Sequence, residues 1–279
     1  MTTTLTSGTV DLRSEAESIE RRALIDLHAA ADDQLRDALG LRLETVDGAT
    51  VSIVAGVPSI VLNRVQGLGL VEPAHKESVT RIRNLYREAG IERFFLHNSD
   101  AAQPPELADW LELAGLKPQR RWMKFVRDAQ QPCESRASSL TVKAADPDTA
   151  ADFGEIAAQG FGLTPEAGRL VSNLVNRPGW RVFLAFDGDT PVGTGALFVA
   201  GDVGWCDWAS TRPDYRGYGS QGALLARRIA EARSLGCRTI YATTGEAVPG
   251  DPQHSYRNLQ RAGFRELYSR DNYAPSEGA

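Results

Sequence analysis

The chain has 279 residues, of which 42% are hydrophobic and 24% charged, a composition typical of a globular protein with room for two domains of ordinary size. Its formal net charge of -5 argues against a broad basic surface for nucleic acid. The three cysteines and four histidines show no metal-ligand spacing, so we expect reduced thiols and no metal site.

The start of the sequence lacks a basic segment followed by an apolar one, and no apolar stretch approaches the length of a membrane span. We therefore expect a cytoplasmic protein without a membrane partner. The sequence does not indicate an oligomeric state.

The first half predicts a helix followed by a strand twice in succession. These elements are a helix at residues 79–90, a strand at 91–97, a helix at 105–115 and a strand through 122–126. A polar stretch with a proline, RDAQQPCESRASS at residues 127–139, follows them. We place the domain boundary there, with one domain at residues 1–130 and a second at residues 139–279.

The second half opens with a strand at Thr141, a helix that begins near Asp146 and ends near Phe161, and another helix from Thr164. Three strands follow, separated by Asp-Gly-Asp and Gly-Asp turns, at residues 181–186, 191–200 and 203–211. They predict an antiparallel meander that runs into a glycine-rich turn and a long helix. This order of elements is typical of an α+β fold.

The end of the second half repeats the elements of the first. It predicts a helix at residues 222–236, a strand at 239–243, a helix at 255–263 and a strand at 264–273. The glycines that end the matching helices, Gly90 with Gly236 and Gly115 with Gly263, lie 146 and 148 residues apart. The spacing indicates a duplicated unit, with chance self-similarity as the alternative.

The segment TRPDYRGYGSQGALLARR, residues 211–228, carries the strongest chemical signal. Gly217, Gly219 and Gly222 let the backbone approach a ligand, and the following helix directs its free N–H groups and positive dipole end at the turn. This arrangement predicts a phosphate site. The segment lacks the Gly-Lys-Ser/Thr of a Walker loop, and its strand belongs to a meander and not to the βαβ unit of a dinucleotide-binding fold.

Pro213, Arg216 and Gly219 make this segment resemble the pyrophosphate loop of the GNAT superfamily. In that family, Arg/Gln-x-x-Gly-x-Gly/Ala follows a strand that ends in Val-x-Pro. Thr211 and Gln221 stand where the family usually has Val and a small residue, so the match is incomplete at two positions.

A second segment, SYRNLQRAGF at residues 255–264, resembles the last helix of the family, which ends in Gly-Phe. The resemblance spans roughly residues 139–273. In the first half, the position of Gly219 falls near Pro73, where no glycine pair is present, so this half resembles a degenerate GNAT domain. The resemblance implies two GNAT-like domains in tandem, each a mixed, mostly antiparallel sheet flanked by helices, with the first domain walling the acceptor site.

The resemblance also implies that acetyl-CoA is the cosubstrate. The backbone of Ala209, Ser210 and Thr211 is expected to pair with the pantetheine amides like an added strand, and Asn258 is expected to contact the same arm. The other expected cofactor contacts lie in the pyrophosphate loop and are Arg216, Gly217, Tyr218, Gly219, Ser220, Gln221 and Gly222.

The catalytic residues are less completely matched. Leu259 occupies the position of the tyrosine that protonates the departing thiolate in many GNAT members, and Tyr256, one turn earlier, is either a substitute acid or a packing aromatic. Glu246, after a strand, and Asp207, within one, are the candidate bases. For each of these two the alternative is a solvated loop acid or a satisfied strand carboxylate.

These features predict an N-acetyltransferase that passes acetyl from acetyl-CoA to a primary amine of a small-molecule acceptor by direct attack. The resemblance does not identify the acceptor. Two alternatives remain. One is a regulatory module that binds acyl-CoA without turnover, which the absent tyrosine at Leu259 favours, and the other is a transferase for a longer acyl group.

Overall fold

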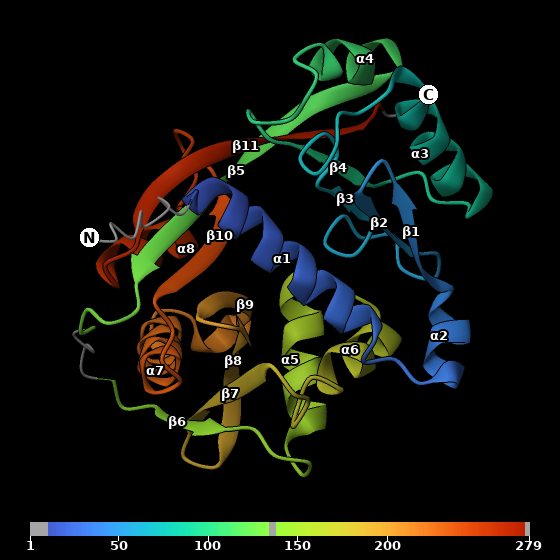
Figure 1. Ribbon diagram of the computed structural model, residues 1–279. Coiled ribbons are helices and arrows are strands. Elements are labelled where there is room, and N and C mark those ends of the chain that lie inside the picture. The colour runs from blue at the N-terminus through green and yellow to red at the C-terminus, as the bar shows by residue number, and fades with distance from the viewer. Residues whose placement is uncertain (1–10, 134–137, 277–279) are drawn as a thin grey trace, which may run out of the picture.

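The computed structural model describes residues 11–133 and 138–276, and its strands form one sheet with helices on both faces (Figure 1). The first half contains α1 Leu12–His28, α2 Asp33–Leu39, β1 Leu41–Val46, β2 Ala49–Val54, β3 Arg64–Gln66, α3 Lys76–Glu88, β4 Phe95–Asn98, α4 Leu107–Leu113 and β5 Leu116–Asp128. The second half contains β6 Thr141–Ala144, α5 Ala150–Phe161, α6 Pro165–Ser172, β7 Trp180–Asp187, β8 Thr190–Ala200, β9 Val203–Thr211, the short 3₁₀ helix η1 Pro213–Tyr215, α7 Ser220–Ser234, β10 Thr239–Gly245, α8 His254–Arg261 and β11 Arg265–Pro275.

The α+β class and the order of the predicted elements are confirmed, with two starts that differ by four residues. The helix expected to begin near Asp146 begins at Ala150. The strand expected at residues 91–97 begins only at Phe95. The reason is local, because Gly90 adopts a φ of 68° and the N–H of Ile91 turns back to the carbonyl oxygen of Tyr86 at 2.9 Å. These residues therefore close α3 before the strand can start.

The sheet has the strand order β1-β2-β3-β4-β11-β5-β10-β9-β8-β7-β6. Each half gives its closing strand to the other half, since β5 pairs with β10, and β11 pairs with β4. β5 and β11 also pair with each other at the centre, so the two halves share one continuous sheet (Figure 1). The sequence predicts both closing strands but not this exchange, because an apolar strand pattern does not specify its neighbour.

Helices cover the two faces in a way that links the halves. α5 and α6 pack against the meander of the second half, around Trp180 and Trp208, and α1 joins them in the same core. α1 belongs to the first half, yet its Glu15 accepts a hydrogen bond from the Tyr241 hydroxyl of β10 at 2.7 Å. On the opposite face, α3 and α4 cover the first half, and α7 and α8 cover the second. The first half therefore reaches across the sheet into the second.

The parallel pair β9 and β10 separates partway along its length. The pairing joins residues 203–205 to residues 239–241 and then stops. Beyond that point, β10 continues beside β5 to Gly245, while β9 continues beside β8 to Thr211. Within the described chain, the facing edges of the two strands are left without a paired strand after Trp205 and Tyr241, and this opening positions the candidate site.

Two further properties of the whole fold bear on function. Over residues 11–133 and 138–276, no helix is long and apolar enough to cross a membrane. In the same ranges, no group of three or more His, Cys, Asp or Glu side chains is placed to hold a metal ion.

Candidate functional site

The open edge of β9 begins at a β-bulge. The register against β8 shifts between Thr194 and Ala196, and Trp208 adopts a φ of 49°. Thr194 stabilises this turn by donating a hydrogen bond from its hydroxyl to the carbonyl oxygen of Trp208 at 2.8 Å. A bulge changes which edge of the strand the later residues face. After Trp208, the backbone groups that would have faced β8 therefore face the opening, and the reverse.

Beyond the bulge, Thr211 presents its backbone to the opening. Arg212 donates its N–H to the carbonyl oxygen of Val192 in β8 at 2.9 Å. Successive residues of a strand direct their N–H and C=O groups to opposite edges. Arg212 faces β8, so the backbone groups of Thr211 face away from β8, and those of Ala209, two residues earlier, do the same. Ser210 differs from the expectation, because its carbonyl oxygen accepts the Gln221 side-chain amide at 2.6 Å. The opening is therefore lined by the backbone of Ala209 and Thr211, and not by that of Ser210.

Helix α7 begins beside this edge with an open N-terminus. Its N-cap is Gly219, with a φ of 86° and no capping side chain, and Ala223 donates the first helical hydrogen bond, to the Gly219 carbonyl oxygen at 3.0 Å. The N–H groups of residues 220–222 precede that bond and have no carbonyl acceptor within the helix. A Cβ atom added at Gly217 or Gly222 would meet no heavy atom within 4 Å, so this end of the helix has room for a ligand.

Gln221 stands where the family usually has a small residue, and its contacts account for the larger side chain. Its side-chain amide donates to the Ser210 carbonyl oxygen and, at 3.0 Å, to the Thr211 hydroxyl. The Gln221 side chain therefore ties the first turn of α7 to β9, and only its backbone N–H is directed to the end of the helix. The sequence does not indicate this bracing role, since it depends on the distance between helix and strand.

The loop before α7 lies on the surface. Arg216 and Gly217 are exposed, and Tyr218 has 61% of its surface exposed. The hydroxyl of Ser138, near the end of the polar stretch at residues 127–139, donates to the Tyr218 carbonyl oxygen at 3.2 Å. An exposed arginine beside free backbone N–H groups suits a phosphate or pyrophosphate.

Asp207 lies on β9 next to the bulge and is partly buried. Its two carboxylate oxygens accept hydrogen bonds from the Trp205 indole N–H at 3.0 Å and from the Trp208 backbone N–H at 2.8 Å. Burial raises the pKa of the Asp207 carboxyl, and the Arg64 guanidinium and the two hydrogen bonds oppose that rise. A carboxylate held by neutral donors, with a pKa shifted towards neutrality, is suited to accept a proton.

Glu246 has a different environment. Its carboxylate forms an ion pair with the Arg121 guanidinium at 2.9 Å and accepts the Arg121 backbone N–H at 3.1 Å. Arg120 also donates to the Glu246 carbonyl oxygen at 2.6 Å. These contacts tie the end of β10 to β5, which is the structural alternative considered for this residue.

Tyr256 lies in the core between α8 and β5. Its ring meets Phe125 edge to face, with centroids 4.8 Å apart. Burial, together with the Glu266 carboxylate of β11, raises the pKa of Tyr256 to about 12. Phe125 belongs to β5, which lies on the side of β10 away from the opening, so the Tyr256 ring packs on that side. The structure thus places Tyr256 as a packing aromatic and not beside Asp207.

The other residues of α8 behave as helix and core residues. Leu259 is 8% exposed and belongs to the hydrophobic core around α7 and α8. The side-chain oxygen of Asn258 accepts a hydrogen bond from Arg261 at 2.6 Å. The amide nitrogen of Asn258 is the part of that side chain left to contact a pantetheine arm.

Sequence reasoning missed a buried ionic cluster between the halves. Glu20 of α1 receives the Lys124 ammonium, the Arg270 guanidinium at 2.6 Å and the Arg64 guanidinium at 3.3 Å. Arg270 also pairs with Glu17 at 2.8 Å. Burial alone would raise the pKa of Glu20, but the three cations outweigh it and hold that pKa well below its usual range. The available signal was a lysine and an arginine inside the strands of the two halves, at positions where alternation predicts buried residues.

The first half contains counterparts of the opening, with different residues. In the first half Arg64 of β3 pairs with Phe95 of β4, and in the second half Trp205 of β9 pairs with Tyr241 of β10. Phe95 and Tyr241 are 146 residues apart, which is the spacing of the repeat, so the two pairs occupy equivalent positions. By this register Gln66 corresponds to Asp207. The next residue, a glycine with a φ of 86°, corresponds to the bulge residue of β9. The first half therefore has an amide at the position of the candidate base.

The N-terminus of α3, the counterpart of α7, is already occupied by an acidic side chain. Asp47, in the turn between β1 and β2, accepts the His75 backbone N–H at 3.2 Å, the His75 ring nitrogen at 3.0 Å and the Ser78 hydroxyl. The Ser78 and His75 hydrogen bonds lower the pKa of the Asp47 carboxyl. An internal carboxylate therefore lies beside the start of α3, whereas no described side chain caps the start of α7.

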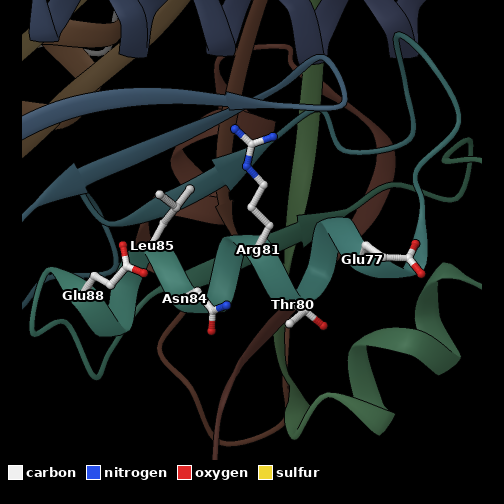
Figure 2. Close-up of a pocket in the computed structure, with 6 residues that line it drawn as sticks. All are labelled: Glu77, Thr80, Arg81, Asn84, Leu85 and Glu88. Atoms are coloured by element: carbon white, nitrogen blue, oxygen red, sulfur yellow. The ribbon is translucent and has the colours of Figure 1, made fainter.

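A hollow on the first half has no relation to these features. Figure 2 shows that its six lining side chains all come from α3, and the hollow measures about 400 Å³. Acidic, basic and amide side chains alternate along it, which is typical of a solvated helix face. It contains none of the predicted site residues.

Comparisons with known proteins agree with this fold. Residues 153–264 match the model of the acetyltransferase (GNAT) family. A GCN5-related N-acetyltransferase from Kribbella flavida has a similar fold, with 14% identity, a TM-score of 0.67, and coverage of 97% of this chain and 98% of that chain. A search of the curated proteins found no match.

Two further solved structures have a similar fold over most of both chains. A GCN5-related N-acetyltransferase from Sphaerobacter thermophilus has 18% identity and a TM-score of 0.59, covering 93% of this chain and 92% of that chain. A tandem GNAT protein from the clavulanic acid biosynthesis pathway has 15% identity and a TM-score of 0.57, with 95% of each chain covered. At these identities the likeness concerns the fold.

Proposed function

Because the chain belongs to the GNAT superfamily, we propose that its second half binds acetyl-CoA and transfers the acetyl group to the primary amine of a small-molecule acceptor. The observation that carries this proposal is the position of the open edge of β9 beside the uncapped N-terminus of α7. An extended arm ending in a pyrophosphate needs both features, one for its amides and one for its charge.

Acetyl-CoA would lie along the opening between β9 and β10. The backbone groups of Ala209 and Thr211 would pair with the amides of the pantetheine arm, and Asn258 would contact the arm from α8. The pyrophosphate would accept the N–H groups of residues 218–222, with the Arg216 guanidinium as its counter-charge. The absence of a Cβ at Gly217 and Gly222 supports this placement, since both positions are open.

The proposed reaction is direct acyl transfer. The amine nitrogen attacks the thioester carbonyl carbon, a C–N bond forms, and the C–S bond breaks to release the CoA thiolate. We assign the general base to Asp207, which takes the proton that the amine loses, because Glu246 is paired with Arg121 and Asp207 has only neutral donors on its carboxylate oxygens. Tyr256 is not assigned to this reaction, and the thiolate takes its proton from solvent.

The first half would act as a wall for the acceptor and not as a second acetyl-CoA site. Asp47 at the N-terminus of α3 and Gln66 at the position of Asp207 support this part of the proposal. In this proposal, residues 1–130 and 139–279 are the two copies of a duplicated domain. The exchange of β5 and β11 makes the two copies one folded unit.

A calorimetric titration with acetyl-CoA tests the proposal. Wild type should bind with micromolar affinity, and Gly219→Asp should lose binding because its carboxylate would lie where the pyrophosphate binds. Gly201→Asp is the control, since Gly201 also has a positive φ, of 65°, but lies in the turn between β8 and β9. An added Cβ would meet nothing within 4 Å at Gly201 and would make only an ordinary van der Waals contact, with Ser138 at 3.4 Å, at Gly219. No binding by wild type, or equal loss in both variants, would overturn the proposal.

The alternative is a regulatory module that binds acyl-CoA without turnover. The observation that favours it is the apolar Leu259 at the usual acid position, together with the packing of Tyr256 against Phe125. An assay of free CoA thiol with a panel of small amines separates the two functions. Amine-dependent thiol release excludes the regulatory module, whereas tight acetyl-CoA binding without release by any amine supports it.

A further inference from the structure

We infer that Trp205 is a positioning residue for Asp207, and that Lys124 of the first half holds Trp205 in place. The inference rests on the proposed function, because it concerns the proposed base. It adds a role for the contact between the halves, which the reaction scheme above does not use.

The first observation is the contact between Trp205 and Asp207. The indole N–H donates to one carboxylate oxygen at 3.0 Å, while the Trp208 backbone N–H donates to the other at 2.8 Å. One donor on each oxygen fixes both the position and the rotation of the carboxylate. The Trp208 donor is a backbone group of the bulge, whereas the Trp205 donor is a side-chain group. Only the Trp205 contact can therefore be removed by a substitution that leaves the backbone of β9 unchanged.

The second observation is the contact on the other side of the indole. The Lys124 ammonium lies 4.6 Å from the centre of the Trp205 ring, a cation–π distance, and both side chains are almost fully buried. Lys124 also forms an ion pair with Glu20 of α1. The ring is therefore held by a cation on its face while its edge holds the carboxylate, so the ionic cluster of the first half is connected to the base of the second.

Trp208 provides the contrast within the same strand. Its ring packs edge to face against Phe161 of α5 at 5.3 Å, and its buried indole nitrogen has no hydrogen-bond partner among the described residues. The two tryptophans thus flank Asp207 in sequence, but only Trp205 turns its polar atom to the carboxylate. A purely apolar packing role would not require that orientation.

Other charged groups act on the same carboxylate from the surrounding elements. Arg64 of β3 and Glu20 of α1 influence Asp207 through space, and Arg228 of α7 approaches the Asp207 carbonyl oxygen at 3.4 Å. A Trp205→Phe variant leaves these groups in place and keeps an aromatic side chain. It removes the indole N–H together with the five-membered ring, so a control with the same loss of buried volume at another indole is needed.

The experiment compares Trp205→Phe with Trp180→Phe in pH–rate profiles of the full chain. Trp180 is the matched control, because it is also 2% exposed and donates its indole N–H to a carboxylate, that of Asp26, at 2.9 Å. Loss of the donor should move the acidic limb of kcat/KM upward by about one pH unit in Trp205→Phe, a roughly tenfold lower rate on that limb. The KM for acetyl-CoA and the Trp180→Phe profile should not change.

A second readout does not need turnover. The chain has five tryptophans, so its indole N–H signals can be followed by ¹⁵N NMR, and the Trp205 signal is identified by its loss in Trp205→Phe. This signal should shift with pH in wild type and should stop shifting in Asp207→Asn. The four other signals serve as internal references.

The outcomes separate the inference from the proposed function. Suppose that Asp207→Asn abolishes turnover but Trp205→Phe moves the acidic limb no more than Trp180→Phe does. The positioning role of Trp205 is then overturned, while the proposed function stands. If Asp207→Asn keeps full activity, the proposed base is wrong, while a Trp205 signal that titrates with Asp207 still establishes the positioning contact. A Trp205 signal that does not respond to pH overturns the contact itself.

Discussion

At the residue scale, the partners of a carboxylate decide which acidic residue can act as a base. Glu246 and Asp207 both lie near strand positions that border the opening, but Glu246 is held by the Arg121 guanidinium, and Asp207 by an indole and a backbone N–H. A directly bound cation stabilises the ionised form, whereas burial with neutral donors favours proton uptake. Contacts in space also assign Tyr256, whose ring packs against Phe125, to the core.

Asp207→Asn should lower kcat by about a hundredfold or more, as expected for the loss of a general base. Burial raises the pKa of Asp207 above its unfolded value, so the base is inactive below that pKa and activity should rise as the pH increases through it. The variant should lose this acidic limb. The measurement is a pH–rate profile with acetyl-CoA at saturation, and Glu246→Gln, which removes the competing candidate, should retain the limb. A limb that survives in Asp207→Asn would contradict the assignment.

At the element scale, α7 and α3 occupy equivalent places in the two halves, but in the part of the chain that the structure describes only the N-terminus of α7 is left free to bind an anion. α7 begins at a glycine and offers free N–H groups, while α3 begins at His75 with the Asp47 carboxylate already bound. The glycine pattern of residues 217–222 predicted the turn into a helix that begins at a glycine. The occupied N-terminus of α3 could not be predicted, because Asp47 lies 28 residues before His75 and reaches it only through the pairing of β1 and β2.

Asp47→Asn should lower the free energy of unfolding at neutral pH by about 0.5–1 kcal/mol, a modest value because the carboxylate is near solvent. The Ser78 hydroxyl and the His75 groups lower the pKa of Asp47, so its contribution is present above its unfolded pKa and is lost as the pH falls through its folded pKa. Urea unfolding at neutral and acidic pH measures this. The variant and wild type should converge in acid, and Asp189→Asn, in the corresponding turn between β7 and β8, should show no difference at either pH. An equal loss at both pH values would contradict the account.

Several details of the site depend on distances that a sequence does not contain. From the sequence we expect the backbone of residues 209–211 to pair with the cofactor, but the bulge at Trp208 and the Gln221 contact turn Ser210 to the other edge. The candidate base could be narrowed to two carboxylates from the sequence. Choosing between them required their partners in space, because pKa shifts arise from neighbours that are far apart along the chain.

At the scale of the whole molecule, the exchange of β5 and β11 makes the second half depend on the first. β5 borders β10, and its Lys124 joins the cluster around Glu20, which also contacts β3 and β11. The repeat of 146 residues predicts duplication and two similar halves. It does not predict that the halves share one sheet and one ionic cluster, since these arise only from the pairing of strands between them.

Glu20→Gln should destabilise the whole chain by about 3–5 kcal/mol, because it leaves three buried cations without their shared carboxylate. Since the cations hold the pKa of Glu20 low, its contribution is present at neutral pH and is lost only as the pH falls through the folded pKa. Urea unfolding at neutral pH measures the change. Asp100→Asn is the control, because its pair with Arg13 is exposed and should contribute less than about 1 kcal/mol. Equal effects of the two substitutions would show that the cluster does not stabilise the joined halves.

The most direct test of the central claim is hydrogen–deuterium exchange of the full chain with and without acetyl-CoA. The account predicts slower exchange at residues 209–211 and 216–222 in the presence of acetyl-CoA, with no change around the N-terminus of α3 at residues 74–78. Protection at residues 74–78, or none at residues 216–222, would contradict the claim that the opening between β9 and β10 and the N-terminus of α7 form the acetyl-CoA site.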